Sequence, residues 1–281
     1  MHLSIWSNLP TPHRAKRKQI ASKLLGDNLV DSLRIVPSSE VSLMVFGSGT
    51  GVMVDIGLHY TKIQPVYNYA ALPHSTVFMP LGGAHVSQAL NTHLRSQGIA
   101  VADSVVDRIK KHVVEVRVTP ADDEDPDSLS CADDETFTLG SRTYTISARE
   151  RCLAAEVLFD PLLAGKQTQG LVASVAQAIQ LSPIDTRKQL SKNICLVGGT
   201  SALRGLRERL QTELAESSPC PVSVNIPVNG TSEEQLCMYQ WCSYLGTHIF
   251  TRALDSTEHF TSATHFEVDS ADALKQFFPY H

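Results

Sequence analysis

Residues 51–57 read Gly-Val-Met-Val-Asp-Ile-Gly, and they open the part of the sequence that decides the fold. Two further runs rich in β-branched and aromatic residues follow, at 60–69 and 75–80. Such runs predict three consecutive strands joined by tight turns, which form an antiparallel meander. A helix over 83–94 is expected next, because Val86, Leu90 and Leu94 recur every four residues after Gly82-Gly83.

A second strand with a glycine turn lies further along the chain. Residues 193–200 read Asn-Ile-Cys-Leu-Val-Gly-Gly-Thr, which predicts a buried strand over 194–197 and a turn. A helix over 203–214 and a strand over 222–226 are expected to follow. The alternation of strands and helices places the chain among α/β proteins.

The remaining expected elements surround these two units. A short β-like run is expected at 32–36, a helical or mixed segment at 101–116 and a hairpin over 137–146. Periodic apolar residues predict helices over 12–25, 38–44, 148–158, 170–179, 184–191 and 237–254.

The charge of the chain is set by one segment. The formal net charge is −5, but eight acids and no Lys or Arg lie between Ala121 and Glu135. Without those eight charges the rest of the chain would carry +3, so the total indicates neither an acidic protein nor a nucleic-acid binder. The stretch after Thr119 has two prolines, Pro120 and Pro126, and almost no apolar residue, and we expect an exposed insertion, or alternatively a docking segment for a basic partner.

Hydropathy and cysteine spacing indicate a protein that stays inside the cell. No stretch approaches about 18 uninterrupted apolar residues, and the N-terminus lacks the order of a signal peptide. The six cysteines form no CxxC pair, which favours free, buried thiols over disulfides or zinc ligands.

The two glycine turns are the candidate sites for chemistry. Glycine lets a backbone approach a phosphate, and a helix that begins beyond the turn favours an anion. The alternative is that these glycines only make tight strand exits, since neither turn matches GxxxxGK[ST] or GxGxxG. Zinc is disfavoured because no HxxxH or HExxH occurs, and no GxSxG is present. Ser130-Cys131 has no nearby base, and His59 and His248 are expected to be packed.

Five blocks, in order, resemble actin and the actin-related proteins. They are residues 51–57, the segment 61–74 that ends in Ala-Leu-Pro-His, Leu81-Gly82-Gly83, the segment 182–200 and Tyr-Leu-Gly-Thr-His-Ile-Phe at 244–250. The resemblance covers roughly residues 3–254. Within the family, the wording Ser-Pro-Ile-Asp-Thr-Arg-Lys-Gln-Leu at 182–190 is most similar to the pointed-end actin-related class of dynactin, the tenth/eleventh class.

The resemblance implies the α/β fold shared by actin, Hsp70 and the sugar kinases. The family's first phosphate loop and second subdomain have no counterpart here, so the chain has either lost them or comes from an incomplete gene model. The implied parts are a remnant of subdomain 1 over 1–46, subdomain 3 over 47–81 and 168–243, subdomain 4 over 82–167 with an acidic insertion at 120–136, and the closing helix and tail of subdomain 1 over 244–281.

The positions that differ from the family decide the expected mechanism. Ser38 stands where the family has the glutamine that positions the attacking water, Leu58 where it has a metal-linked carboxylate, and Lys62 where it has a histidine. Lys111 and Asp107 replace the acid and the arginine near the nucleoside. The family's cofactor-binding positions that remain are Asp55, Gly57, Gly83, Gly198, Gly199 and Thr200.

We therefore expect no catalytic residue, no metal site, no ATPase activity and weak or absent binding of ATP or ADP. Losing two phosphate contacts of about 1.5–3 kcal/mol each weakens binding by about 10²–10⁴-fold. The first hypothesis is a cytoplasmic, cytoskeletal cap on the pointed end of a short actin-like filament in a dynactin-like complex. Its partners would be filament subunits and other pointed-end proteins, with no nucleic acid or membrane insertion. The alternatives are a subunit of an axonemal, cortical or chromatin-remodelling assembly and, third, an ATP hydrolase or sugar kinase.

Overall fold

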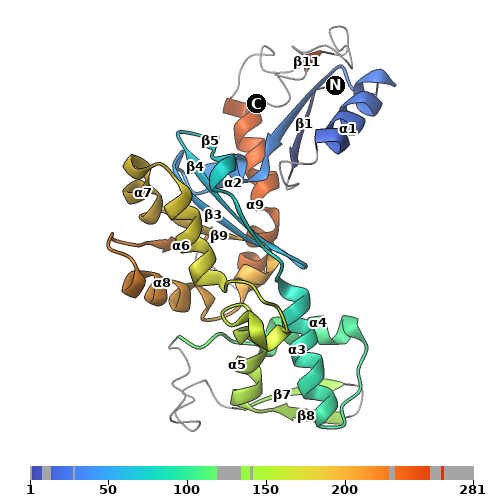
Figure 1. Ribbon diagram of the computed structural model, residues 1–281. Helices are drawn as coiled ribbons and strands as arrows, with labels where there is room; N and C mark the ends of the chain where they lie inside the picture. Colours follow the sequence, from blue (N-terminus) through green and yellow to red (C-terminus); the bar gives the residue numbers. More distant parts are fainter. Residues whose placement is uncertain are drawn as a thin grey trace.

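The computed structural model describes residues 2–7, 14–27, 29–118, 134–139, 142–227, 232–253 and 261–262. These residues form an elongated molecule with three levels, seen from top to bottom in Figure 1. A three-stranded sheet lies at one end, a six-stranded sheet in the middle, and a two-stranded hairpin at the other end. None of the described helices is both long and apolar enough to cross a membrane.

The central sheet contains both glycine turns. Its strands are β3 (Gly51–Ile56), β4 (Thr61–Tyr67), β5 (Ala70–Ala71), β6 (Val77–Met79), β9 (Ile194–Val197) and β10 (Val224–Asn225). The path runs β10-β9-β3-β4-β5, and β6 also pairs with β4. Strands β3, β4 and β6 pair antiparallel, as the predicted meander requires, whereas β9 runs parallel to β3.

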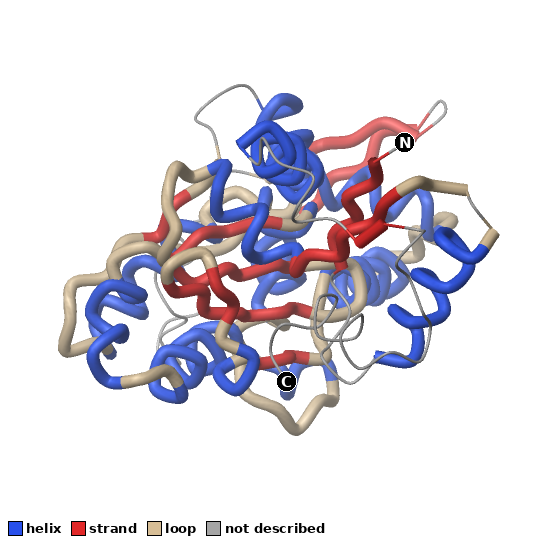
Figure 2. Tube along the Cα trace, turned by 90° about the horizontal axis from the view of Figure 1, so that it is seen from above, coloured by secondary structure: helices blue, strands red, loops and turns tan. Residues whose placement is uncertain are grey.

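Both faces of this sheet are buried, and Figure 2 shows helices on both sides of the strands. The helices α6 (Leu171–Leu181) and α7 (Ile184–Ser191) contact β3, β4 or β6. The helices α2 (Ser38–Val45) and α9 (Ser232–Ala253) contact the sheet as well, α2 at β3, β4 and β5 and α9 at β9. Residues alternate between the two cores: Ile194 and Leu196 lie in one cluster, and Cys195 and Val197 in the other. A strand buried on both faces reads as a continuous apolar run, which is why residues 194–197 were recognisable.

The lower end of the molecule in Figure 1 consists of helices and a hairpin. Its elements are α3 (Gly83–Ser96), α4 (Asp103–Val113), β7 (Glu135–Leu139), β8 (Arg142–Ile146) and α5 (Ala148–Glu156). Residues 120–133 of the predicted insertion (120–136) are not among the described residues. Its last two residues, 135 and 136, belong to β7. Glu135 of β7 accepts hydrogen bonds from Arg151 and Arg204.

The upper end holds β1 (His2–Ser7), β2 (Ser32–Pro37), α1 (Arg14–Gly26) and β11 (Thr261–Ser262). Strand β1 pairs parallel with β2, and the sequence pattern had not predicted it. The short helical turns η1 (Pro73–Ser75), η2 (Pro161–Ala164) and η3 (Gly199–Ala202), with α8 (Leu206–Ser217), complete the described elements. The helix expected over 203–214 begins three residues later, because η3 and a left-handed Gly205 precede it.

The prediction of free, buried cysteines is confirmed for two residues, confirmed in part for a third and wrong for a fourth. Cys195 and Cys242 are free and buried, and Cys220 is free and partly buried. Burial raises the pKa of the Cys242 thiol to about 12, with a smaller contribution from the negative charge of Asp55. Cys152, by contrast, is disulfide-bonded.

Candidate functional site

The site lies where β3 and β9 end. Because these two strands are parallel, their carboxyl ends meet at one edge of the sheet, and Asp55 stands directly opposite Val197. Gly198 follows with a φ of +89°, a conformation that side chains rarely adopt. A Cβ on Gly198 would lie 2.5 Å from the Ile56 carbonyl oxygen and 2.6 Å from Oδ1 of Asp55. The two glycine turns are therefore packed directly against each other.

The carbonyl oxygen of Gly57 joins the remaining predicted residues. It accepts a hydrogen bond from the backbone N–H of Gly83 at 2.9 Å and another from Oγ1 of Thr200 at 3.0 Å. The N–H of Ala84, the next donor of α3, binds the carbonyl of Leu58 at 2.7 Å. A helix N-terminus is well placed to bind a phosphate, because its first N–H groups have no partner within the helix. In α3 the first two of these N–H groups donate to carbonyl groups of the protein instead.

All six residues predicted at the vestigial pocket are brought together. Gly199 lies beside Gln240 of α9, whose Nε2 would be 3.1 Å from an added Cβ. Thr200 touches α3, since its Oγ1 would be 2.5 Å from a Cβ on Gly83. The geometry shows how closely Asp55, Gly57, Gly83, Gly198, Gly199 and Thr200 pack, and their part in nucleotide binding stays a prediction.

Lys110 is a member of this site that the sequence analysis missed. Its ammonium group donates to the Gly83 carbonyl at 3.0 Å, to Oγ of Ser87 at 2.7 Å and to Oδ1 of Asp107 at 3.1 Å. Ser87 also donates to Asp107. The hydrogen bond from Ser87, and to a smaller extent the one from Lys110, hold the pKa of the Asp107 carboxyl below its usual value. A lysine has three N–H donors, and here each has an acceptor on α3 or α4.

A signal for Lys110 was present in the sequence. On α4 the buried residues are Val106, Ile109, Lys110 and Val113, which recur at helical spacing. A lysine on the apolar side of a helix is rarely buried unless it is paired. The position of Lys110 among the buried residues of α4 therefore indicates that its ammonium group has a partner.

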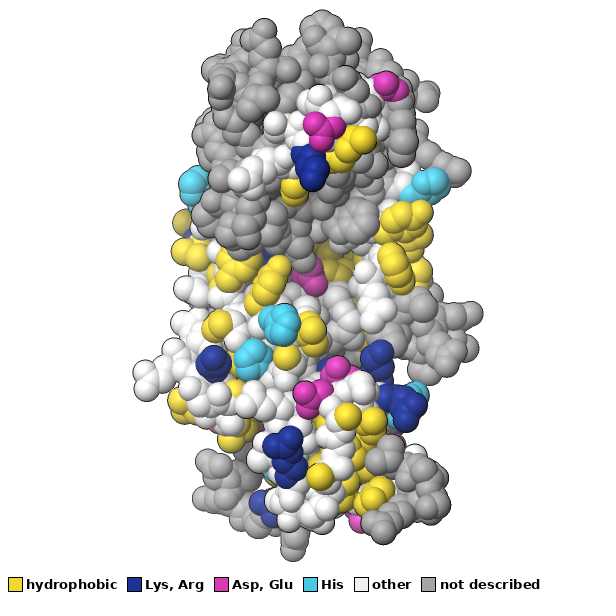
Figure 3. Space-filling view, turned by 90° about the vertical axis from the view of Figure 1, so that its right-hand side faces the viewer, with side chains coloured by type: hydrophobic (Ala, Val, Ile, Leu, Met, Phe, Trp, Pro, Cys, Tyr) yellow, Lys and Arg dark blue, Asp and Glu magenta, His cyan; other side chains and the backbone are white. Residues whose placement is uncertain are grey.

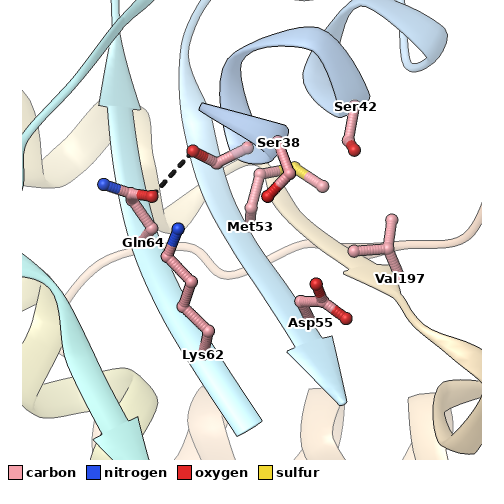
Figure 4. Close-up of a pocket in the computed structure, with 8 residues that line it drawn as sticks. Ser38, Ser42, Met53, Asp55, Lys62, Gln64 and Val197 are labelled. Carbon is pink, nitrogen blue, oxygen red and sulfur yellow. Dashed lines mark hydrogen bonds between the residues drawn. The ribbon is translucent and has the colours of Figure 1, made fainter. Parts of the chain in front are cut away.

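A second part of the site is a small polar cavity beside Asp55. Three serines of α2 line it (Ser38, Ser39 and Ser42), together with Met53 and Asp55 of β3, Lys62 and Gln64 of β4 and Val197 of β9 (Figure 4). Its volume is about 10 Å³, enough for about one water molecule, whereas pockets for small ligands have about 300–1,000 Å³.

Side chains of the protein account for that small volume. Ser39 donates to Oε1 of Gln64 at 2.8 Å, and Gln64 donates to Oγ1 of Thr76 at 3.2 Å. The buried Lys62 stands directly across the β3–β4 ladder from Asp55, so a positive and a negative residue oppose each other at the cavity.

These residues do not fit a nucleotide with a divalent ion. Leu58, at the position of the metal-linked carboxylate, is 53% exposed and offers no oxygen ligand from its side chain. No group of three or more His, Cys, Asp or Glu side chains among the described residues is arranged to hold a metal ion. The positive and donor groups of this site, Lys110 Nζ and Gly83 N–H, are already hydrogen-bonded to Ser87, Asp107 and Gly57.

A comparison with known protein families identifies the fold. The model of the actin family matches residues 7–104 and 99–253, which together span most of the chain. The chain belongs to the actin family. The α/β, actin-like fold expected from the sequence is confirmed by this match and by the mixed sheet with helices on both faces. In this actin-family chain Gly83 and Thr200 donate to the Gly57 carbonyl, and Lys110 donates to the Gly83 carbonyl.

Replacing Lys110 by methionine tests whether the site is held by its own side chains. We expect Lys110→Met to lower the free energy of unfolding by about 1–3 kcal/mol, because Asp107 and Ser87 lose a buried, charged donor. Lys111→Met, on the exposed neighbour, is the matched control and should change stability by less than about 0.5 kcal/mol. Urea unfolding followed by circular dichroism measures both.

The same samples test nucleotide binding. A ligand at about 100 times its Kd stabilises a protein by about 2.7 kcal/mol, so micromolar affinity for Mg-ATP would raise the melting temperature clearly at millimolar concentration. We expect no rise for the wild type or for Lys110→Met. A calorimetric Kd in the micromolar range would contradict the account of the site given above.

Proposed function

We propose that this actin-family chain is a non-catalytic structural subunit that caps the pointed end of a short actin-like filament in a dynactin-like complex. The observation that carries the proposal is the double hydrogen bond to the Gly57 carbonyl, from Gly83 N–H and Thr200 Oγ1. These contacts join the loops between which the family binds its nucleotide. A subunit that satisfies them internally needs no nucleotide to hold its fold.

The absence of catalysis follows from the same positions. Phosphoryl transfer requires an oriented attacking water and a metal ion held by carboxylates. Ser38 lines a cavity with room for about one water, and Leu58 supplies no carboxylate. We infer that the chain neither hydrolyses ATP nor phosphorylates a sugar, and that its glycines are retained for backbone packing.

Capping is supported by a difference between two surfaces of the molecule. At the turn between α6 and α7, Leu181 is 52% exposed and Ile184 is 77% exposed. The outer face of α4, toward the lower end of the molecule in Figure 1, exposes Arg108, Lys111 and His112. A head-to-tail filament grows only when complementary surfaces lie at both ends of each subunit. A subunit with an apolar docking surface beside its central sheet and a charged surface on α4 joins a filament and stops it.

The β4–β5 turn of the central sheet also exposes a large side chain. Tyr69 is 59% exposed in the β4–β5 turn, where it has a φ of +64°. Its ring packs against the backbone of the preceding loop, within 2.8 Å of where a Cβ on Gly49 would lie. We propose that this turn and the α6–α7 turn contact the last filament subunit, and that the protein is cytoplasmic and cytoskeletal.

The experiment uses actin filaments whose barbed ends are blocked by a capping protein. On dilution, subunits then leave only from the pointed end, and we expect the purified chain to slow that loss severalfold. Ile184→Asp should abolish the effect, because it places a charge in an apolar contact. Val118→Asp, a change of another exposed aliphatic residue, should leave it intact.

Two results would contradict the proposal. The first is a chain that fails to bind filament ends in a co-sedimentation experiment with short filaments. The second is a chain that promotes elongation, which would mean that both of its ends carry filament contacts. Purification of the tagged protein with its partners, followed by mass spectrometry, separately tests whether the complex contains dynactin-like subunits.

A further inference from the structure

A hollow lies on the surface between α4 and β7, toward the lower end of the molecule in Figure 1. It has a volume of about 440 Å³, within the range of pockets that hold a ligand or a short peptide segment. Its apolar lining comes from Val105, Ile109 and Val113 of α4 and Phe137 of β7. Figure 3 shows hydrophobic side chains gathered at this level of the molecule, with Lys and Arg side chains beside them.

Strand β7 meets this groove with its edge. Four consecutive residues of the strand, 135–138, line the groove, although successive side chains of a strand point to opposite faces. That combination places the backbone edge of β7 along the groove. Among the described residues β7 pairs only with β8, so its other edge has N–H and C=O groups that bind no strand. Such an edge is a template for an added strand.

The rim of the groove is positive. Arg108 and His112 line it, and the exposed Lys111 lies between them on α4. Arg108 and Lys111 make no hydrogen bond or ion pair with any part of the chain that the structure describes. The acids nearby are already bound: Glu135 accepts from Arg151 and Arg204, and Asp107 accepts from Ser87 and Lys110.

We propose that an extended segment of a partner protein, with alternating acidic and apolar residues, binds here as an additional strand on β7. Its backbone would pair with the free edge of β7, its apolar side chains would enter the groove beside Ile109 and Phe137, and its carboxylates would meet Arg108 and Lys111. This is β-strand addition, in which the backbone supplies affinity and the pockets supply specificity. The proposal stands whether or not the chain caps a filament.

The chain's own acidic segment is a poorer occupant of the groove. Between 119 and 133 it carries Pro120, Pro126 and six acids, and Leu129 is its one large apolar residue. Proline removes a backbone donor, and aspartate is depleted in strands. An apolar groove beside an open strand edge calls for several β-branched or aromatic residues, which this segment lacks.

The test uses a fluorescein-labelled peptide, Glu-Ile-Glu-Val-Glu-Ile-Glu, titrated with the full chain and followed by fluorescence anisotropy. We expect Arg108→Glu to weaken binding at least tenfold, because it reverses the charge that faces the carboxylates. Lys188→Glu, the same charge change on the exposed surface of α7, is the control and should bind as the wild type does. Equal weakening by both variants, or no binding by the wild type, overturns the proposal.

Two N-methylated peptides test the strand pairing without altering the protein. One is methylated on the backbone nitrogens of the three apolar residues, the other on those of the central glutamates. Because alternate N–H groups of an added strand point toward β7, one peptide should lose binding at least tenfold and the other should keep it. Equal binding of both overturns strand addition.

The chain's own segment is tested with a variant whose six acids between 122 and 133 are replaced by asparagine or glutamine. Binding within about threefold of the wild type supports a groove that is open to a partner. A gain of more than tenfold would show that the acidic segment occupies the groove, and the assignment to a partner would be wrong.

Discussion

Gly246→Ala is expected to reduce the free energy of unfolding by about 3 kcal/mol, one of the two largest effects that the structure predicts. An added Cβ would lie against the backbone carbonyl group of Val41 and 3.0 Å from the Ser42 nitrogen. The helices α2 and α9 are in close contact here, since the Ser42 and Ser243 hydroxyls are 2.8 Å apart. Backbone cannot move aside as a side chain can, so the helices must separate.

The sign of this effect is informative because helix propensity acts in the opposite direction. Alanine in a helix interior is favoured over glycine by about 1 kcal/mol, so a loss of stability must come from the α2–α9 contact. Gly26→Ala is the control, since nothing lies within 4 Å of a Cβ at that position. Guanidinium unfolding measures the free energy of unfolding of both variants. Equal values for Gly246→Ala and Gly26→Ala would contradict the observed packing.

Arg151→Met is the second large effect, with an expected loss of about 3 kcal/mol. The Arg151 side chain is fully buried; its Nε donates to the Val113 carbonyl at 2.8 Å, and its guanidinium meets Glu115 and Glu135 at 2.9 Å each. Removing one member of such a network leaves charges without a partner, which costs about 3–5 kcal/mol. We expect a loss at the low end of this range, because the carboxylates of Glu115 and Glu135 are 25% and 33% exposed and remain partly solvated.

Arg149→Met, two residues earlier on α5, is the matched control, because this arginine is exposed and makes no contact that the structure describes. We expect its unfolding free energy to stay within about 0.5 kcal/mol of the wild type. Hydrogen exchange adds a local readout: the β7–β8 amides should exchange faster in Arg151→Met, because Glu135 of β7 loses one of its two arginines. Unchanged exchange there would mean that the network does not hold the hairpin.

Local patterns predicted the central strands and most helices correctly. The run at 194–197 is apolar throughout because both faces of β9 are covered, and α7 spans Ile184–Ser191 as expected. The same patterns predicted that Gly57 and Gly198 follow strands. Their meeting is a consequence of the parallel pairing of β3 with β9, which joins residues about 140 positions apart.

The failures have physical causes. Strand β1 was missed because its six residues form a strand only through pairing with β2, 30 positions later. Lys110 was missed because its acceptors, Gly83 and Ser87, lie on another helix. The disulfide of Cys152 was missed because spacing alone carries no information on which side chains meet in the fold.

The sequence by itself determined the family, and residue identities such as Leu58 and Ser38 are the basis of the prediction that the nucleotide site is degenerate. The stretch at 51–57 and the one at 193–200 were enough for the α/β fold. Only the tertiary structure decided how the two glycine turns are held: by hydrogen bonds from Gly83 and Thr200 to one carbonyl, and by a buried lysine with three acceptors. Hydrogen bonds and ion pairs act over about 3 Å, and only folding brings residues so distant in the chain that close.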